Sequence, residues 1–227
     1  MKVKFGALVT EGRGKLGGHV ASRNRSGAYL RTKVTPVNPE TVYQTAVRNR
    51  LTGISQDWRG LTAEQRAAWN AAVENFAKTD IFGDLKNPSG NSLYQRLNNN
   101  LLIVGSAQIT VPPLPSEVYA PSALSLAADL SSTTVTATYA PVIPAGQAVK
   151  VYATPLMSAG VSFVKSEYRL IEVIVAADVS PYNLYPTWNA KFGLLVVGAK
   201  VFVKFVPVNS VTGQEGTALS ASTIVVA

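Results

Sequence analysis

The chain has 227 residues, 47% of them hydrophobic and only 15% charged, with no cysteine and a single histidine. This composition supplies enough apolar side chains for buried cores and differs from that of a disordered chain. It excludes disulfides, thiolate metal ligands and thiol nucleophiles, and it leaves no set of histidines for a metal site. Carboxylates are sparse and scattered, so we expect no enzyme, no cofactor and no metal site.

The net charge is confined to one end of the chain. The formal charge is +8, and residues 1–50 contain ten basic and two acidic residues, whereas the remaining eleven of each sign cancel. A charge this segregated steers association with partners and carries no information about fold. It indicates a basic N-terminal arm that meets an acidic surface or a nucleic acid, attached to a near-neutral body.

Residues 1–37 are predicted to form this basic, glycine-rich arm together with a β-hairpin. Two β-compatible runs, 19–23 and 28–34, flank Asn24–Gly27, whose Asn and Gly suit a tight turn. In the second run Tyr29, Arg31 and Lys33 alternate with apolar residues, which predicts one aromatic and basic face.

Residues 12–17 read G-R-G-K-L-G and match the dinucleotide-binding fingerprint. That fingerprint requires a strand before it and a helix after it, whereas a strand is expected to follow here. We therefore interpret this segment as part of a flexible basic arm.

Residues 38–110 are predicted to form a small three-helix bundle. Asn38-Pro39-Glu40 has the pattern of a helix start, and Thr62 followed by Gln65 matches a capping box. A third helix is expected to begin near residues 91–92, after a loop over 81–90. Trp58 and Trp69 fall on apolar stripes and are expected in the core.

The proline-rich segment 111–116 is the clearest boundary and is predicted to be a stiff linker. Residues 117–227 are predicted to form a β-sandwich, because β-forming runs alternate with turn residues. The expected strands are 123–127, 133–139, 148–153, 168–175, 192–197, 200–206 and 222–226. Seven short strands in this length are typical of an immunoglobulin-like or fibronectin-III-like sandwich, and the lack of cysteine favours the latter. The predicted fold class is a multidomain α+β chain.

Cationic and aromatic residues of the N-terminal half are the candidate partner-binding residues. They are Arg13, Lys15, Arg23, Arg25, Tyr29, Arg31, Lys33, Arg48 and Arg50. Arginine forks bind anionic oxygens and aromatic faces stack on bases, so nucleic acid is one candidate partner. An acidic groove of a protein subunit is the favoured alternative, and a solvated hairpin edge is the third.

Two stretches of the chain resemble a known family. They are residues 14–18, 22–33, 36–39, 44 and 48, and then 58–62, 65–66 and 69, with similarity continuing through 98–102. These segments are similar to small structural, auxiliary virion proteins of tailed bacteriophages and prophages of Bacteroidetes, including crAss-like phages. The resemblance implies a virion component and brings no catalytic or ligand residues with it.

The residues and the resemblance together predict a non-enzymatic virion protein, assembled in the bacterial host cytoplasm. The expected role is capsid decoration, with the basic arm anchoring the protein to the shell. A portal, neck or tail component is one alternative, and a DNA-binding protein that uses the basic hairpin is another. The expected partners are other virion proteins or further copies of the chain. We expect neither a membrane nor a small-molecule substrate.

Overall fold

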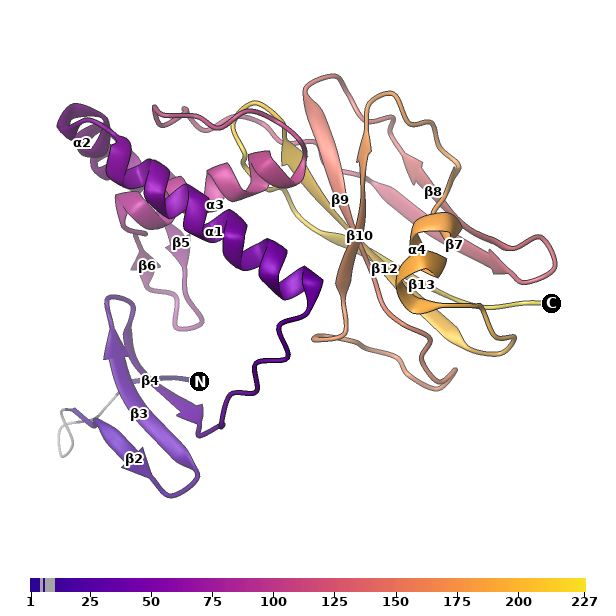
Figure 1. Ribbon diagram of the computed structural model, residues 1–227, viewed down its shortest axis with the longest axis horizontal. Coiled ribbons are helices and arrows are strands. Elements are labelled where there is room, and N and C mark those ends of the chain that lie inside the picture. Colours follow the sequence, from indigo (N-terminus) through magenta and orange to yellow (C-terminus); the bar gives the residue numbers. More distant parts are fainter. Residues whose placement is uncertain (5, 7–10) are drawn as a thin grey trace. The chain divides into compact units, whose positions relative to one another are not determined.

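The computed structural model describes residues 1–4, 6 and 11–227, so residues 5 and 7–10 of the expected arm lie outside the described part. The protein has a mixed α+β fold, as predicted, with four α-helices and several antiparallel sheets over the described residues (Figure 1). The chain divides into two compact units. Unit 1 comprises Met1–Asn49 and Ala77–Asn87; unit 2 comprises Arg50–Phe76 and Pro88–Ala227. The boundaries predicted from the sequence at 37, 110 and 116 stay predictions.

Unit 1 contains a four-stranded antiparallel sheet. Its strands are β1 (Lys2–Val3), β2 (Gly14–Leu16), β3 (His19–Asn24) and β4 (Gly27–Thr32), in the order β1-β4-β3-β2. The expected hairpin is therefore present as β3 and β4. Gly27 has a φ of 108°, which a side chain would disfavour, while the Asn24 side chain accepts a hydrogen bond from the Ser26 amide at 2.9 Å.

The expected loop over 81–90 contains part of a second, smaller hairpin, made by β5 (Lys78–Thr79) and β6 (Leu85–Lys86). Asp80 closes its turn, because one carboxylate oxygen accepts hydrogen bonds from the amides of Phe82 at 2.8 Å and Asp84 at 3.1 Å. Lys2 lies 3.4 Å from Asp80, and Lys4 lies 3.0 Å from Asp84. These ion pairs connect the small hairpin to the N-terminal strand.

Helix α1 (Val42–Gly60) begins later than the sequence predicts. The Asn38-Pro39-Glu40 start is wrong, since Glu40 has a φ of 50°, in the left-handed region. The Thr41 hydroxyl instead accepts a hydrogen bond from the Gln44 amide at 3.3 Å and occupies the capping position. Residues up to Asn49 belong to unit 1 and the rest of the helix to unit 2.

The helical part of unit 2 has its own core. Helix α2 (Ala63–Ala71) starts with the predicted capping box of Thr62 and Gln65, and η1 (Ala72–Phe76) is a 3₁₀ turn. Helix α3 (Gly90–Ile103) is capped by Ser89. The buried residues that these helices share are Ile54, Leu61, Trp69, Leu93, Tyr94 and Leu97.

The two tryptophans of this region pack as the sequence predicts. Trp69 is fully buried, its indole N–H donates to the Thr110 carbonyl at 2.8 Å, and its ring meets Tyr94 edge-on at 5.3 Å. Trp58 is half-buried, with its ring centroid 5.4 Å from that of Tyr94. Both therefore stabilise the helical core.

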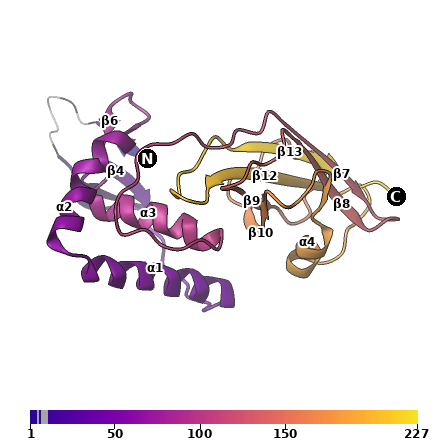
Figure 2. The ribbon, with the colours of Figure 1, turned by 90° about the horizontal axis from the view of Figure 1, so that it is seen from above.

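The β-region of unit 2 consists of two antiparallel sheets that share one core (Figures 1 and 2). One sheet has the order β10-β9-β12-β13 and the other the order β11-β8-β7. The strands are β7 (Ala123–Asp129), β8 (Thr134–Ala140), β9 (Gln147–Ala153), β10 (Arg169–Val175), β11 (Tyr182–Asn183), β12 (Lys200–Asn209) and β13 (Leu219–Ile224). Alternate residues of β8, β9 and β12 point into the core, including Val135, Val151 and Phe205.

The expected strand over 192–197 is wrong. Residues 185–192 form helix α4 (Tyr185–Phe192), with Pro186 in its first turn, and the following Leu194 is 73% exposed. The helix forms because it buries Trp188, whose indole N–H donates to the Thr154 carbonyl at 3.0 Å. The apolar run suggested a strand, but residues 193–197 form none, and only Leu195 among them is buried.

The helices and the β-region contact each other directly. Asn100 of α3 donates from its side-chain amide to the Gly213 carbonyl at 2.8 Å and accepts from the Lys150 amino group at 3.0 Å. Lys150 is 2% exposed and also pairs with Glu215. Along the 111–116 segment, the Gln214 side chain donates to the Leu114 carbonyl at 2.9 Å. Residues 111–116 belong to unit 2.

Candidate partner-binding surface

The register of the unit 1 sheet assigns the candidate residues to its two faces. Tyr29 pairs with Lys2 and Ser22, Arg31 pairs with Val20, and Val20 pairs with Lys15. Residues directly opposite each other in an antiparallel sheet project from the same face. Lys2, Lys15, Tyr29 and Arg31 therefore lie on one face, which we call the cationic face.

The opposite face is mainly apolar. By the same register it carries Val3, Leu16, Ala21, Ala28 and Leu30. Arg23 pairs with Ala28 and lies on this face together with His19, so the structure separates Arg23 from Tyr29 and Arg31.

The alternation of side chains within residues 28–32 could be predicted from the sequence, but the register across the four strands could not. Sequence reasoning therefore missed Lys2 as a member of the cationic face.

Glu11 neutralises part of the candidate set. Its carboxylate lies 2.8 Å from Arg13 and 3.5 Å from Arg23. The hydrogen bond from Arg13 is the main cause that lowers the pKa of Glu11 below its usual value, with a smaller contribution from Arg23. By contrast, Lys15, Arg25, Arg31 and Lys33 form no ion pair with any described residue. Their charge is available to a partner.

Arg25 and Lys33 lie at the ends of the hairpin. Arg25 belongs to the two-residue turn between β3 and β4, and Lys33 follows β4, where its amide donates to the Gly18 carbonyl at 2.8 Å. These two cations extend the positive charge beyond the strands.

Arg48 and Arg50 do not join the sheet. Arg48, in α1, donates a hydrogen bond at 2.5 Å to the side-chain oxygen of Asn38, which lies on the segment before that helix. Arg50 belongs to unit 2, where its charge acts on the Tyr152 hydroxyl. Burial is the larger effect there and raises the pKa of Tyr152, with Glu215 adding to it and Arg50 opposing it. Eight of the nine candidates therefore belong to unit 1 and Arg50 belongs to unit 2.

The G-R-G-K-L-G segment lacks the setting of a dinucleotide site. Gly14–Leu16 is strand β2, Gly17 and Gly18 form a turn, and β3 follows directly. A strand–turn–strand unit has no helix N-terminus to receive a pyrophosphate. Within the described ranges, no three His, Asp or Glu side chains are placed to hold a metal ion. The helices described are also too short or too polar to cross a membrane.

Unit 1 has no core of its own over the residues that the structure describes. None of its described residues is buried, whereas unit 2 has two buried clusters. Large apolar side chains remain in solvent, among them Leu16 at 73% and Val37 at 86% exposure. A small sheet whose residues are at most half-buried lacks the burial that normally stabilises one.

Comparisons with known proteins add no assignment: the chain matches no protein-family model, and no curated protein or solved structure is significantly similar to it.

Proposed function

We propose that this chain is a non-enzymatic structural protein of a tailed-phage virion, and that it docks on acidic surfaces of other virion subunits through its N-terminal sheet. The role we favour is capsid decoration. The family resemblance of residues 14–48 and 58–69 supports the virion setting. The structure of unit 1 supports the docking mode.

The observation that carries the proposal is that unit 1 has a formed sheet without a buried residue. Full burial of Leu16, which is 73% exposed, against a partner would contribute about 1.5–3 kcal/mol, and the half-buried Val3 and Leu30 would each contribute less. A single exposed ion pair contributes at most about 1 kcal/mol, so the cations would act together and mainly select an acidic partner. A partner would thus supply the core that the sheet lacks.

The finer description of unit 2 belongs to the same proposal. We infer that the helices form a three-helix bundle and that the β-region is a fibronectin-III-like sandwich. Support for the sandwich comes from the strand orders, because seven strands divide into one sheet of four and one of three around a common core. Modules of this kind occur in many unrelated proteins, so the sandwich does not itself indicate the function.

The test is a comparison of two charge-reversal variants on particles assembled with the full chain. K15E/R31E reverses two cations of the cationic face, and R59E/R66E reverses two exposed cations of the helices that form no ion pair with described residues. Both variants change the net charge equally. Immunogold labelling should find the wild type and R59E/R66E on particles, with K15E/R31E reduced at least about tenfold.

Label absent from wild-type particles would remove the virion assignment. Equal labelling of the two variants would instead refute docking through the cationic face. The position of the label also separates the decoration role from the alternatives, since label confined to one vertex or to the tail would replace decoration by a portal, neck or tail role.

DNA binding remains the second candidate function, because Tyr29 lies on the same face as Lys15 and Arg31. A duplex-binding protein would lose affinity steeply as salt rises. Titration of labelled duplex into the full chain at about 50 mM salt decides this, and absence of binding there removes the candidate.

A further inference from the structure

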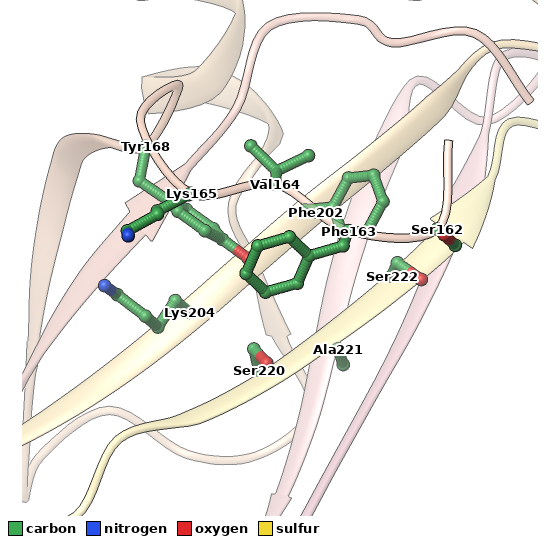
Figure 3. A pocket seen from close by; sticks show the side chains of 10 residues that line it. All are labelled: Ser162, Phe163, Val164, Lys165, Tyr168, Phe202, Lys204, Ser220, Ala221 and Ser222. Atoms are coloured by element: carbon green, nitrogen blue, oxygen red, sulfur yellow. The ribbon is translucent and has the colours of Figure 1, made fainter.

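A pocket in the β-region lies between the outer face of the four-stranded sheet and the loop that precedes β10 (Figure 3). Its volume is about 460 Å³, within the range of small-ligand sites. It is lined by Ser162, Phe163, Val164, Lys165, Tyr168, Phe202, Lys204, Ser220, Ala221 and Ser222. No residue of this lining carries a negative charge.

The strand register explains why the sheet side of the pocket is polar and aromatic. In β12, Val201, Val203 and Phe205 point into the core, so Phe202 and Lys204 point to the outer face. Across the ladder, Phe202 pairs with Ser222 and Lys204 pairs with Ser220. Two serine hydroxyls, one ring and one ammonium group therefore share this face.

The loop that covers the sheet is fixed near both ends. Met157 pairs with Lys200 by two backbone hydrogen bonds, and the Lys200 amino group donates to the Val161 carbonyl at 3.0 Å. At the other end, Arg169 donates to the Ser166 carbonyl at 2.8 Å. Val164, in the middle of the loop, has a buried side chain. These hydrogen bonds fix the position of the loop that forms one wall of the pocket.

Two cations of the pocket have no carboxylate partner among the described residues. Lys204 lies over the rings of Tyr168, at 4.9 Å, and Tyr152, at 5.4 Å, and neither Lys204 nor Lys165 forms an ion pair with a described residue. Figure 3 shows the amino groups of both lysines at one end of the pocket. The stacking on two tyrosines orients Lys204 without neutralising it. This end of the pocket suits an anionic group.

The rest of the pocket suits a polyhydroxylated ring. The side-chain hydroxyls of Ser162, Ser220 and Ser222 form no hydrogen bond within the described structure. Phe163 is 77% exposed, so its ring is available for stacking against the C–H face of a ligand. In Figure 3 Phe163 lies between the two lysine amino groups and the pair Ser162 and Ser222, while Ser220 lies on the lysine side, opposite Lys204 in the strand register. Hydroxyls and an aromatic face next to a cationic end are complementary to a sugar that bears a carboxylate.

We propose that this pocket binds an acidic saccharide, with the carboxylate at Lys165 and Lys204, the sugar ring on Phe163, and sugar hydroxyls at the serines. The site lies in unit 2 and shares no residue with the cationic face of unit 1. It therefore stands or fails independently of the proposed virion role. Sequence reasoning did not find it, because its residues come from three segments that only the sheet brings together.

The test uses the full chain and three probes: glucuronate, glucose and acetate. Titration followed by NMR or calorimetry should show glucuronate binding at least about tenfold more tightly than either control, since glucose lacks the carboxylate and acetate lacks the ring. The variant K165M/K204M should weaken glucuronate binding at least about tenfold, and F163A should weaken it measurably. The control R59M/R66M removes two exposed cations elsewhere and should leave binding unchanged.

Lys165 and Phe163 are exposed, so F163A and the single variant K165M should unfold at the wild-type temperature. This keeps the test informative even where the double variant is destabilised. Glucuronate that fails to bind at about 100 mM overturns the proposal, and so does acetate binding as tightly as glucuronate. Equal binding by wild type, K165M and F163A would place any observed binding at another site and would also overturn it.

Discussion

Replacing Gly213 by alanine should separate α3 from the β-region and destabilise unit 2. Gly213 has a φ of 72°, which costs an alanine about 1–2 kcal/mol. A Cβ atom built there would lie 2.3 Å from the Leu97 carbonyl oxygen and 2.8 Å from its carbon, and both are backbone atoms of α3. Relieving this contact requires the helix or the loop to move, at a cost of about 1–3 kcal/mol.

The combined loss is about 3 kcal/mol, because movement also weakens the hydrogen bond from Asn100 to the Gly213 carbonyl. For a chain of this size, that corresponds to a fall of about 6–12 °C in the midpoint of thermal unfolding. Urea denaturation followed by tryptophan fluorescence measures the free energy directly.

Gly146 provides a matched control. It has a φ of 76°, close to that of Gly213, and a Cβ atom there would have nothing within 4 Å. G146A should therefore cost only the conformational part, about 1–2 kcal/mol. Equal losses in G213A and G146A would refute the reasoning that the loop and α3 are in tight contact.

Three further predictions concern local features of unit 2. T62A removes the acceptor for the Gln65 amide, at 3.2 Å, and should lower the free energy of unfolding by about 1 kcal/mol, whereas T62S should not. W188F leaves the buried Thr154 carbonyl without its indole donor and should cost about 2–3 kcal/mol in urea denaturation, so a loss near zero would contradict the described bond. The hydrogen bonds from Ser131, in the first place from its side chain, lower the pKa of Asp129 in the folded state. The stabilisation by Asp129 is then complete above the unfolded pKa, near pH 4, and is lost as the pH falls through the lower folded value, so the stability difference between wild type and D129N should shrink on acidification.

Local signals in the sequence were sufficient for several elements. The Thr62–Gln65 capping box, the hairpin around residues 24–27 and five of the seven strands expected after residue 116 correspond closely to elements of the structure, because each depends on neighbouring residues. The start of α1 was misplaced, since Thr41 and Asn38 are both competent caps and only the backbone at Glu40 decides between them. The apolar run 192–197 was wrongly predicted to be a strand. Its first residue, Phe192, is instead the last residue of helix α4, which buries Trp188.

The sequence predicted that the candidate surface is basic, but it did not predict which residues share one face of the sheet. Alternation within β4 identified Tyr29 and Arg31 as members of one face, because residue spacing along a single strand sets that pattern. Pairing with β1 and β2 then added Lys2 and Lys15 to that face and placed Arg23 on the other. Register between strands depends on hydrogen bonds over long sequence separations, and no local pattern contains it.

The sequence by itself determined that the positive charge is confined to one end and that the chain is a mixture of helices and strands, since both follow from composition and from periodicity. Only the tertiary structure decided which strands pair and which distant residues are in contact. Long-range pairing gave the N-terminal sheet a cationic and an apolar face without a core. Long-range contacts also joined α3 to the β-region through Gly213 and assembled the pocket around Lys204 from separate segments. Such contacts depend on shape and packing over the whole unit, which neighbouring residues do not specify.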